Sequence, residues 1–220
     1  MCGRFTLSKR ELGDIAEFLD AEVAAGDAEL YRPRYNVAPT DTHFVLERVE
    51  NRRVLVPATW GLDGGPRGLV VNARAETVAG KRLYSQSLAH HRCVVPTDGF
   101  FEWTGPKRER RPIWFHPPGG ELLLLAGLYQ PRPTGRAAFT ILTTAANELV
   151  ARVHDRMPCV LPRDRVEAWL QAPRLELLVP APSELLVATE VSAKVNDVHN
   201  DDPTCLDPPD EKSKPQLRLF

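Results

Sequence analysis

The sequence predicts an α+β fold, namely a single domain of curved, largely antiparallel β-sheets with peripheral helices. Short strand-like apolar runs outnumber helical patterns, and many of them follow one another directly. Of the 220 residues, 20 are proline, well above the average of about 5%, which indicates many turns and short elements. No Pro/Gly-rich linker divides the chain, and its 43% hydrophobic residues suffice for one substantial core.

Local patterns define the elements of the N-terminal half. Ser8 and Glu11 form a capping box, and apolar residues between Leu12 and Leu19 recur at helical spacing, which together predict a helix. Prolines break up the following segment, and two β-rich runs meet at Glu50-Asn51. The predicted elements are a helix over Ser8–Ala21, a loop over Tyr31–Thr40, a hairpin over Thr42–Val56, a helix over Lys81–Arg92 and a strand over Cys93–Val95.

The C-terminal half is predicted to alternate short strands with brief helices. Asn147 can cap one of these helices, and Val166, Trp169 and Leu170 share one face of the other. The predicted strands are Gly99–Trp103, Pro112–His116, Leu122–Tyr129, Ala138–Thr143, Met157–Leu161 and Leu185–Val191, and the predicted helices are Asn147–Val153 and Arg163–Gln171.

The composition excludes several classes of function. A formal net charge of −1 does not favour general nucleic-acid binding, so any such binding must depend on a local group of arginines. No apolar stretch approaches the ~18–20 residues of a membrane span, and the N-terminus lacks the features of a signal peptide. The four cysteines contain no CxxC pair, and Cys93 and Cys159 read as core thiols. We therefore expect a cytoplasmic monomer without a metal, another cofactor or a membrane partner.

The composition changes near Asn200. Aspartate and proline dominate from there onward, a mixture that cannot form a packed core. The predicted domain therefore covers residues 1–199, and residues 200–220 are predicted to be a disordered tail. The tail nevertheless ends in the apolar pentapeptide Gln216-Leu217-Arg218-Leu219-Phe220.

The second residue is the most informative one for chemistry. Removal of Met1 would leave an N-terminal Cys2, which carries an amine and a thiol on adjacent carbons. An α-amine has a pKa of about 7.7–8.0, against about 10.4 for lysine, so a useful fraction is unprotonated at neutral pH. Cys2 would then offer two nucleophiles for the same carbon. The simpler interpretation is that a cysteine happens to follow the initiator.

Five short blocks place polar side chains among turn or strand residues. Each is weak by itself, because a glutamate in a strand can face water and a His-Asp pair can lie on the surface. The blocks are Cys2-Gly3-Arg4, Asn72-Ala73-Arg74-Ala75-Glu76, Gly99-Phe100-Phe101-Glu102-Trp103, His154-Asp155-Arg156-Met157-Pro158 and Ser192-Ala193-Lys194-Val195-Asn196.

In this order and spacing the blocks resemble the SOS-response-associated peptidase (SRAP) family. The resemblance runs from Met1 to about Asn196 and includes Tyr35-Asn36-Val37-Ala38-Pro39 and Trp60-Gly61-Leu62. It implies a protein that senses and shields abasic sites in single-stranded DNA. The amine of Cys2 would form a Schiff base with the aldehyde of the opened deoxyribose, and the thiol would close a thiazolidine on the same carbon.

The resemblance also implies roles for individual residues. Glu102 would move protons with a raised pKa, and His154 would act as acid or base in ring opening. Asn72 would hold the sugar or the Cys2 main chain. The residues implied in DNA contact are Arg4, Arg74 and Arg156 as phosphate clamps, Trp60 as a stacking or wedging aromatic, and Pro39. An equally open reading of Trp60 is a buried core indole.

Imine chemistry also permits β-elimination, so we expect a secondary abasic-site lyase activity, and removal of Met1 by the protein itself is chemically conceivable. Two alternatives stay open at this point. An amidohydrolase with an N-terminal cysteine nucleophile would begin with the same residues, and a non-covalent single-stranded DNA-binding module would use the arginines alone.

The C-terminal pentapeptide resembles the QLxLF motif with which bacterial repair proteins bind the replicative sliding clamp. Leu217, Leu219 and Phe220 would fill an apolar groove while Gln216 makes a polar contact, and the acidic segment would act as a tether. This resemblance implies a position at replication forks within the nucleoid. The alternative is a tail that folds back on its own domain.

Overall fold

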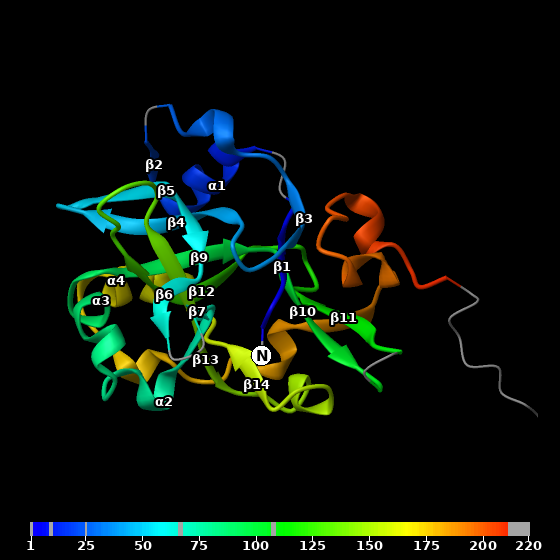
Figure 1. Cartoon of the computed structure of the whole chain (residues 1–220). Helices are drawn as coiled ribbons and strands as arrows, with labels where there is room; N and C mark the ends of the chain where they lie inside the picture. The colour runs from blue at the N-terminus through cyan, green and yellow to red at the C-terminus, as the bar shows by residue number, and fades with distance from the viewer. Residues whose placement is uncertain (1, 9–10, 25, 66–67, 107–108, 211–220) are drawn as a thin grey trace, which may run out of the picture.

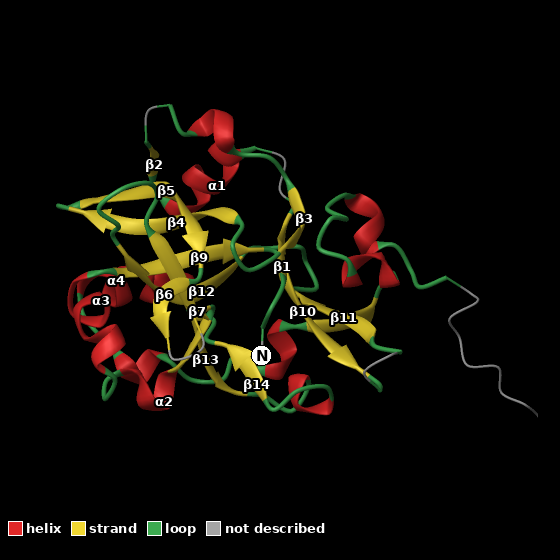
Figure 2. Cartoon of the chain, in the orientation of Figure 1, coloured by secondary structure: helices red, strands yellow, loops and turns green. Residues whose placement is uncertain are grey.

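The computed structural model describes residues 2–8, 11–24, 26–65, 68–106 and 109–210. The chain forms two main β-sheets that pack together, with helices and short turns outside them (Figures 1 and 2). The predicted α+β fold is confirmed. Within the described ranges, no helix is long and apolar enough to span a membrane.

The larger sheet closes into a ring. Its central strands run in the order β13-β12-β9-β4-β5, and β13 pairs in turn with β5. The ring pairings are antiparallel except for that between β13 and β5. These strands are β4 (Thr42–Val49), β5 (Arg52–Trp60), β9 (Arg92–Thr97), β12 (Leu123–Gln130) and β13 (Ala138–Ala145).

Strand β13 is long enough to change neighbours along its length. Its first residues lie between β12 and β5, whereas its last residues lie between β14 (Arg156–Pro158) and β8 (Asn72–Arg74). The short strand β2 (Glu22–Val23) joins the far side of β5. The end of β13 therefore brings two segments of the chain together that are about 80 residues apart.

The smaller sheet carries the start of the chain. Its order is β15-β11-β10-β1-β3, formed by β15 (Val187–Glu190), β11 (Arg111–His116), β10 (Gly99–Thr104), β1 (Phe5–Leu7) and β3 (Arg34–Val37). All its pairings are antiparallel. A Cβ atom at Gly99 would overlap the indole nitrogen of Trp114, so only glycine allows this close packing at the start of β10.

The remaining elements are short. A hairpin of β6 (Leu62–Gly65) and β7 (Gly68–Val70) forms a separate two-stranded sheet next to β13. The α-helices are α1 (Leu12–Leu19), α2 (Ala75–Val78), α3 (Ser85–His90) and α4 (Val166–Gln171). The 3-10 turns are η1 (Ala28–Leu30), η2 (Arg82–Tyr84), η3 (Val150–Arg152), η4 (Arg163–Arg165), η5 (Leu175–Leu177), η6 (Ser183–Leu185), η7 (Ala193–Asn196) and η8 (Pro203–Leu206).

Two apolar clusters hold these layers together. Alternate residues of the ring strands face opposite sides, as the period of two in a strand requires. Val94 and Leu124 pack outward with Trp169 and the apolar side of α1, whereas Cys93 and Leu125 pack inward with the smaller sheet. The thiols of Cys93 and Cys159 are both buried, as predicted.

Most predicted elements are present, with changed lengths. The hairpin turns at Glu50 (φ 55°), and α4 buries the three predicted residues. The predicted helix over Lys81–Arg92 consists of η2 followed by α3. Asn147 does accept the amide hydrogen of Val150 at 2.9 Å, but only a 3-10 turn follows.

Two local predictions were wrong. The hydroxyl of Ser8 does not cap α1, because it donates to the carboxylate of Asp98 at 2.6 Å, and the helix begins after Glu11. The segment predicted as a loop over Tyr31–Thr40 contains β3, which pairs with β1. In both cases a tertiary contact overrides the local pattern.

The predicted disorder from Asn200 onward is also wrong for residues 200–210. Asp201 accepts hydrogen bonds from the amides of Tyr35 and Asn36 at 2.7 and 2.9 Å. Cys205, in η8, is fully buried. The folded part therefore extends past the predicted boundary at residue 199, while residues 211–220 lie outside the described residues.

Candidate active site

Cys2 lies at the junction of the two sheets, where the chain enters β1. The pairing of β1 with β10 continues toward the N-terminus, because the amide of Phe101 donates to the carbonyl of Arg4 at 3.0 Å. Figure 1 shows this start of the chain between β13–β14 on one side and β10–β11 on the other. Cys2 is fully buried and belongs to the inner apolar cluster.

Asn72 fixes the main chain of Cys2 from the side of the larger sheet. It begins β8, which runs parallel to β13 with Asn72 opposite Ile141. Its side-chain amide donates to the carbonyl of Cys2 at 2.7 Å. The other atom of the amide, Oδ1, is buried and accepts no hydrogen bond from the described residues, so it is available to a donor that enters the site.

Glu102 approaches Cys2 from the smaller sheet. It lies on β10 opposite Ile113, and only 3% of the residue is exposed. Burial raises the pKa of the Glu102 carboxyl, and the charge of His154 partly offsets this shift. Burial also raises the pKa of the Cys2 thiol, and the Glu102 carboxylate raises it further. The thiol therefore stays protonated, and the carboxyl group keeps its proton to a higher pH than an exposed glutamate does.

His154 lies between η3 and β14. Its Nδ1 accepts the amide hydrogen of Arg156 at 3.0 Å, so in the neutral ring the proton is on Nε2. The carboxylate of Asp155 also lies 3.0 Å from Nδ1 and can pair with the ring when it is protonated. The charge of His154 lowers the pKa of Glu102, so the two groups are close enough to interact.

The end of β13 brings Arg74 and Arg156 together. Arg74 lies opposite Thr143 on one side of β13, and Arg156 lies opposite Ala145 on the other. Arg74 is exposed, whereas Arg156 donates to both oxygens of Glu76 at 2.7 and 2.8 Å and to the carbonyl of Thr143 at 2.6 Å. The guanidinium of Arg156 lowers the pKa of Glu76.

Arg4 is held within the protein. Its Nη1 donates to Oδ1 of Asn36 at 2.7 Å and to the carbonyl of Val195 at 2.8 Å. The guanidinium lies 5.8 Å from the ring centre of Trp103, which is only partly buried. Pro39 is partly buried in the turn after β3, apart from these contacts.

The predicted DNA-stacking role of Trp60 is not compatible with its position. The indole is fully buried, donates to the carbonyl of Val71 at 2.9 Å and stacks on Phe139 at a ring separation of 6.2 Å. The alternative interpretation, a core indole, is correct. The hydrogen-bond partner explains why a tryptophan can be buried at this position.

Sequence reasoning missed two residues that organise the site. Glu76, the partner of Arg156, is part of the quoted Asn72–Glu76 block but was given no role. Asn36, the partner of Arg4, is part of the segment Tyr35–Pro39 and was treated only as a match. For Asn36 the available signal was a polar residue among Tyr35, Val37 and Ala38.

The structure thus brings Cys2, Asn72, Glu102 and His154 together from four separate segments. The arrangement provides a nucleophile with a fixed main chain, a buried acid with a raised pKa and an imidazole. Such a set can add a nucleophile to a carbonyl carbon and move the protons that this requires. Across the described part of the chain, no cluster of three or more His, Cys, Asp or Glu residues is arranged to hold a metal ion.

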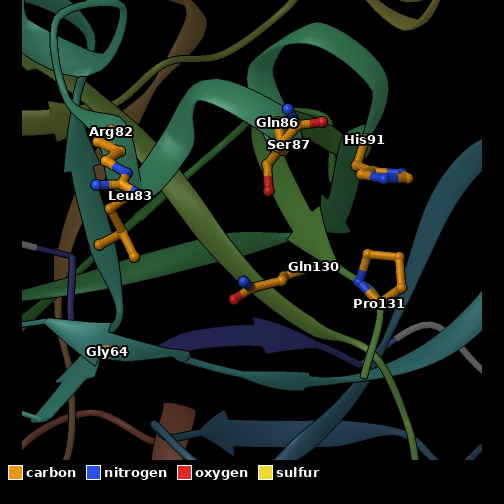
Figure 3. A pocket seen from close by; sticks show the side chains of 8 residues that line it. All are labelled: Gly64, Arg82, Leu83, Gln86, Ser87, His91, Gln130 and Pro131. Carbon is orange, nitrogen blue, oxygen red and sulfur yellow. The ribbon is translucent and has the colours of Figure 1, made fainter. Parts of the chain in front are cut away.

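A separate hollow of about 680 Å³ lies beside α3 and includes none of these residues (Figure 3). Most of its side chains are polar, and Leu83 and Pro131 are the apolar ones. Its lining consists of Gly64, Arg82, Leu83, Gln86, Ser87, His91, Gln130 and Pro131.

The model of the family described as SOS response associated peptidase (SRAP) matches residues 1–198. The abasic site processing protein YoqW of Bacillus subtilis is 33% identical over 225 residues, which cover 94% of this chain and 99% of that protein. The abasic site processing protein YedK of Escherichia coli is 31% identical over 179 residues, covering 78% and 80%. A crystal structure of a protein from Bacteroides thetaiotaomicron has the same fold, with a TM-score of 0.79, 22% identity, and coverage of 94% and 99%.

Proposed function

Since the chain belongs to the SOS response associated peptidase (SRAP) family, we propose that it processes abasic sites in single-stranded DNA by forming a covalent crosslink through Cys2. The observation that carries the proposal is the hydrogen bond from Asn72 to the carbonyl of Cys2, which holds this residue beside Glu102. The relatives named abasic site processing proteins support the substrate class.

The first step is the addition of the Cys2 amine to C1′ of the ring-opened deoxyribose. Removal of Met1 must come first, because the amine is otherwise part of a peptide bond. His154 gives a proton to the ring oxygen of the sugar as the C1′–oxygen bond breaks, and the anomeric hydroxyl loses its proton to water, which exposes the aldehyde. The amine nitrogen then adds to C1′, and one amine proton passes to the former carbonyl oxygen. Glu102 gives its proton to the resulting hydroxyl, which leaves as water, and takes up the second amine proton, giving the Schiff base. The raised pKa of Glu102 keeps that proton available.

The second step closes the ring. The Cys2 sulfur adds to the same C1′, and the thiol proton passes to the imine nitrogen, so the product is a five-membered thiazolidine. The thiol is suited to react second rather than first, because burial keeps it protonated and only the thiolate is a strong nucleophile. In the resting protein the thiol donates to the carbonyl of Arg4 at 3.7 Å. The sulfur is tethered next to the imine carbon, which favours closure over attack by a separate thiol.

Single-stranded DNA is the proposed partner. Arg74 and Arg156 project from the two strands that flank the end of β13, and planar guanidinium groups suit phosphate binding. Pro39 is proposed as an apolar contact with the DNA. The Schiff base also permits β-elimination at the neighbouring carbon, which gives a secondary lyase activity, and the same groups can act on the peptide bond after Met1.

The test uses purified, untagged protein that begins at Cys2 and single-stranded DNA with one abasic site. A band that keeps its shift in a denaturing gel is expected for the native chain, and none for Cys2→Ala or a chain extended N-terminal to Cys2. Absence of the band from a chain confirmed to begin at Cys2 would exclude the proposal. Glutamine hydrolysis without DNA would then favour an amidohydrolase, and salt-sensitive reversible binding would favour a non-covalent module.

A further inference from the structure

The side chain of Asn36 joins three segments of the chain, one of which carries Arg4, two residues after Cys2. Asn36 lies on β3 and is fully buried. Its Oδ1 accepts from Arg4 at 2.7 Å. Its Nδ2 faces three main-chain carbonyls of the turn around η7, those of Val195 at 3.2 Å, Asp197 at 2.9 Å and Asn200 at 2.7 Å. One amide therefore connects β3, the start of β1 and the C-terminal turn.

The C-terminal turn is itself bound to β3 on one side and to β10 on the other. Asp201 accepts from the main-chain amides of Tyr35 and Asn36 and pairs with the guanidinium of Arg34. On the other side, the indole nitrogen of Trp103 donates to Asn196 at 2.7 Å. Hydrogen bonds therefore hold this turn in place on both sides.

Arg4 connects Asn36 and the C-terminal turn to the segment that carries Cys2. Its Nη1 is bound by Asn36 and by the carbonyl of Val195, while its own carbonyl accepts from the amide of Phe101 at 3.0 Å. Both the side chain and the main chain of Arg4 are thus fixed two residues from Cys2. The remaining N–H groups of the guanidinium are not needed for this connection.

We propose that Asn36 is a positioning residue for Cys2, acting through Arg4, and that Arg4 serves mainly as this internal connection rather than as a phosphate clamp. The inference rests on the proposed function of Cys2. It gives a role to the Ser192–Asn196 block, whose carbonyl at Val195 accepts from both Arg4 and Asn36. A misplacement of about 1 Å can reduce the rate of a positioned reaction by about 100-fold.

The test separates positioning from DNA binding. Asn36→Leu keeps approximately the same volume but removes all these hydrogen bonds, whereas Asn36→Asp keeps an acceptor for Arg4 and loses the donors to the turn. Arg4→Met removes the connection and leaves Asn36 bound to the turn. The matched control is Arg53→Ala, which removes hydrogen bonds to Glu167 and the carbonyl of Leu19 elsewhere in the molecule.

Two quantities are measured for each variant with single-stranded DNA. The first is the crosslinking rate at saturating abasic DNA. The second is the Kd for DNA that carries a tetrahydrofuran residue, which has no aldehyde and reports only non-covalent binding. We expect Asn36→Leu and Arg4→Met to reduce the crosslinking rate about tenfold or more, with Kd changed less than twofold. The rate of Asn36→Asp should lie between those of these two variants and that of the native protein. Arg53→Ala should crosslink at the native rate.

A normal crosslinking rate in a folded Asn36→Leu or Arg4→Met protein would overturn the proposal. So would a weaker Kd with a smaller salt dependence for Arg4→Met, because that result identifies a phosphate contact. If the native protein forms no crosslink, the proposed function fails by itself. Mass spectrometry of the Cys2 adduct with glyoxylate, a small aldehyde that requires no DNA, then tests positioning separately: slower adduct formation in Asn36→Leu supports it, and an equal rate contradicts it.

Discussion

The side-chain amide of Asn72 donates a 2.7 Å hydrogen bond to the main-chain carbonyl of Cys2. This contact joins the first residues of the chain to the larger sheet, whereas the amide of Phe101 joins them to the smaller one through Arg4. Cys2 is therefore fixed from both sheets by contacts that do not use its amine or thiol. The thiol, and the amine once Met1 is removed, take part in neither of these two contacts.

Replacement of Asn72 by alanine should slow crosslinking without unfolding the protein. One hydrogen bond contributes about 0.5–1.5 kcal/mol, which corresponds to a rate reduction of roughly 2–10-fold if the contact acts only by fixing Cys2. A gel-based time course with abasic single-stranded DNA measures the effect. Asn72→Asp has nearly the same shape but cannot donate when ionised, so it should be at least as slow; an Asp variant with the native rate would contradict this role.

Replacement of Glu102 by glutamine should stabilise the protein increasingly as the pH rises. Burial raises the pKa of this carboxyl above its ordinary value of 4.5, so the folded state binds the proton more tightly than the unfolded state. Its contribution to stability is fully present below pH 4.5 and is lost as the pH rises through the folded-state pKa. Urea unfolding of both proteins between pH 4 and pH 8 measures this difference.

The gain from Glu102→Gln should therefore be small at pH 4 and larger at pH 8. The same variant should crosslink slowly at every pH, because an amide cannot supply the proton that leaves with water. A constant difference in the free energy of unfolding across this range would show that the carboxyl group is not perturbed in the folded protein.

Trp60→Phe should affect stability and leave DNA binding unchanged. The indole is fully buried and its nitrogen donates to the carbonyl of Val71, so phenylalanine leaves a cavity and a buried acceptor without a donor. We expect a loss of about 1–3 kcal/mol in the free energy of unfolding, measured by urea denaturation. A selective loss of affinity for abasic DNA, with stability unchanged, would instead support stacking on the bases.

The strands of the ring could be predicted from sequence, whereas β3 could not. In β9 and β12, both buried on two faces, apolar residues are nearly continuous, and this pattern depends only on local sequence. The strand β3 has four residues between two prolines, and it exists because β1 pairs with it. Ser8 likewise has the sequence of a cap, but its hydroxyl instead donates to the carboxylate of Asp98, 90 residues away.

Sequence grouped the four candidate reactive residues, whereas the contacts that hold them in place could not be predicted. The short polar blocks of the sequence and the family resemblance grouped Cys2, Asn72, Glu102 and His154 as a set. The bonds of Arg156 to Glu76 and of Asn36 to Val195 span 80 and 159 residues. Such pairings arise from the crossing of distant strands, which residue spacing along one chain does not encode.

Arg156→Gln should weaken non-covalent binding of single-stranded DNA, and Glu76→Gln should strengthen it. Glu76 occupies both terminal nitrogens of Arg156, so a phosphate must compete with this carboxylate for the guanidinium. Loss of one phosphate contact should reduce the slope of log Kd against log salt concentration by about 0.7. The measurement is fluorescence anisotropy with tetrahydrofuran DNA at several salt concentrations.

Arg74→Gln is the matched control for that experiment, because Arg74 lies on the neighbouring strand and is already exposed. It should reduce the salt slope by a similar amount, and its effect should not depend on Glu76. An unchanged slope in Arg156→Gln would assign this arginine a purely structural role as the partner of Glu76 and Thr143.

The C-terminal pentapeptide should bind a bacterial sliding clamp. Residues 216–220 lie outside the described part of the chain, so this prediction rests on the sequence Gln216-Leu217-Arg218-Leu219-Phe220, in which apolar side chains would enter a groove beside one polar anchor. Pull-down of purified clamp by the native protein, and its loss in Leu219→Ala/Phe220→Ala, is the expected result. Crosslinking of abasic DNA should stay unchanged in this variant, because the reactive residues lie more than 60 positions earlier in the chain. Equal capture of the clamp by both proteins would instead exclude these side chains from the contact.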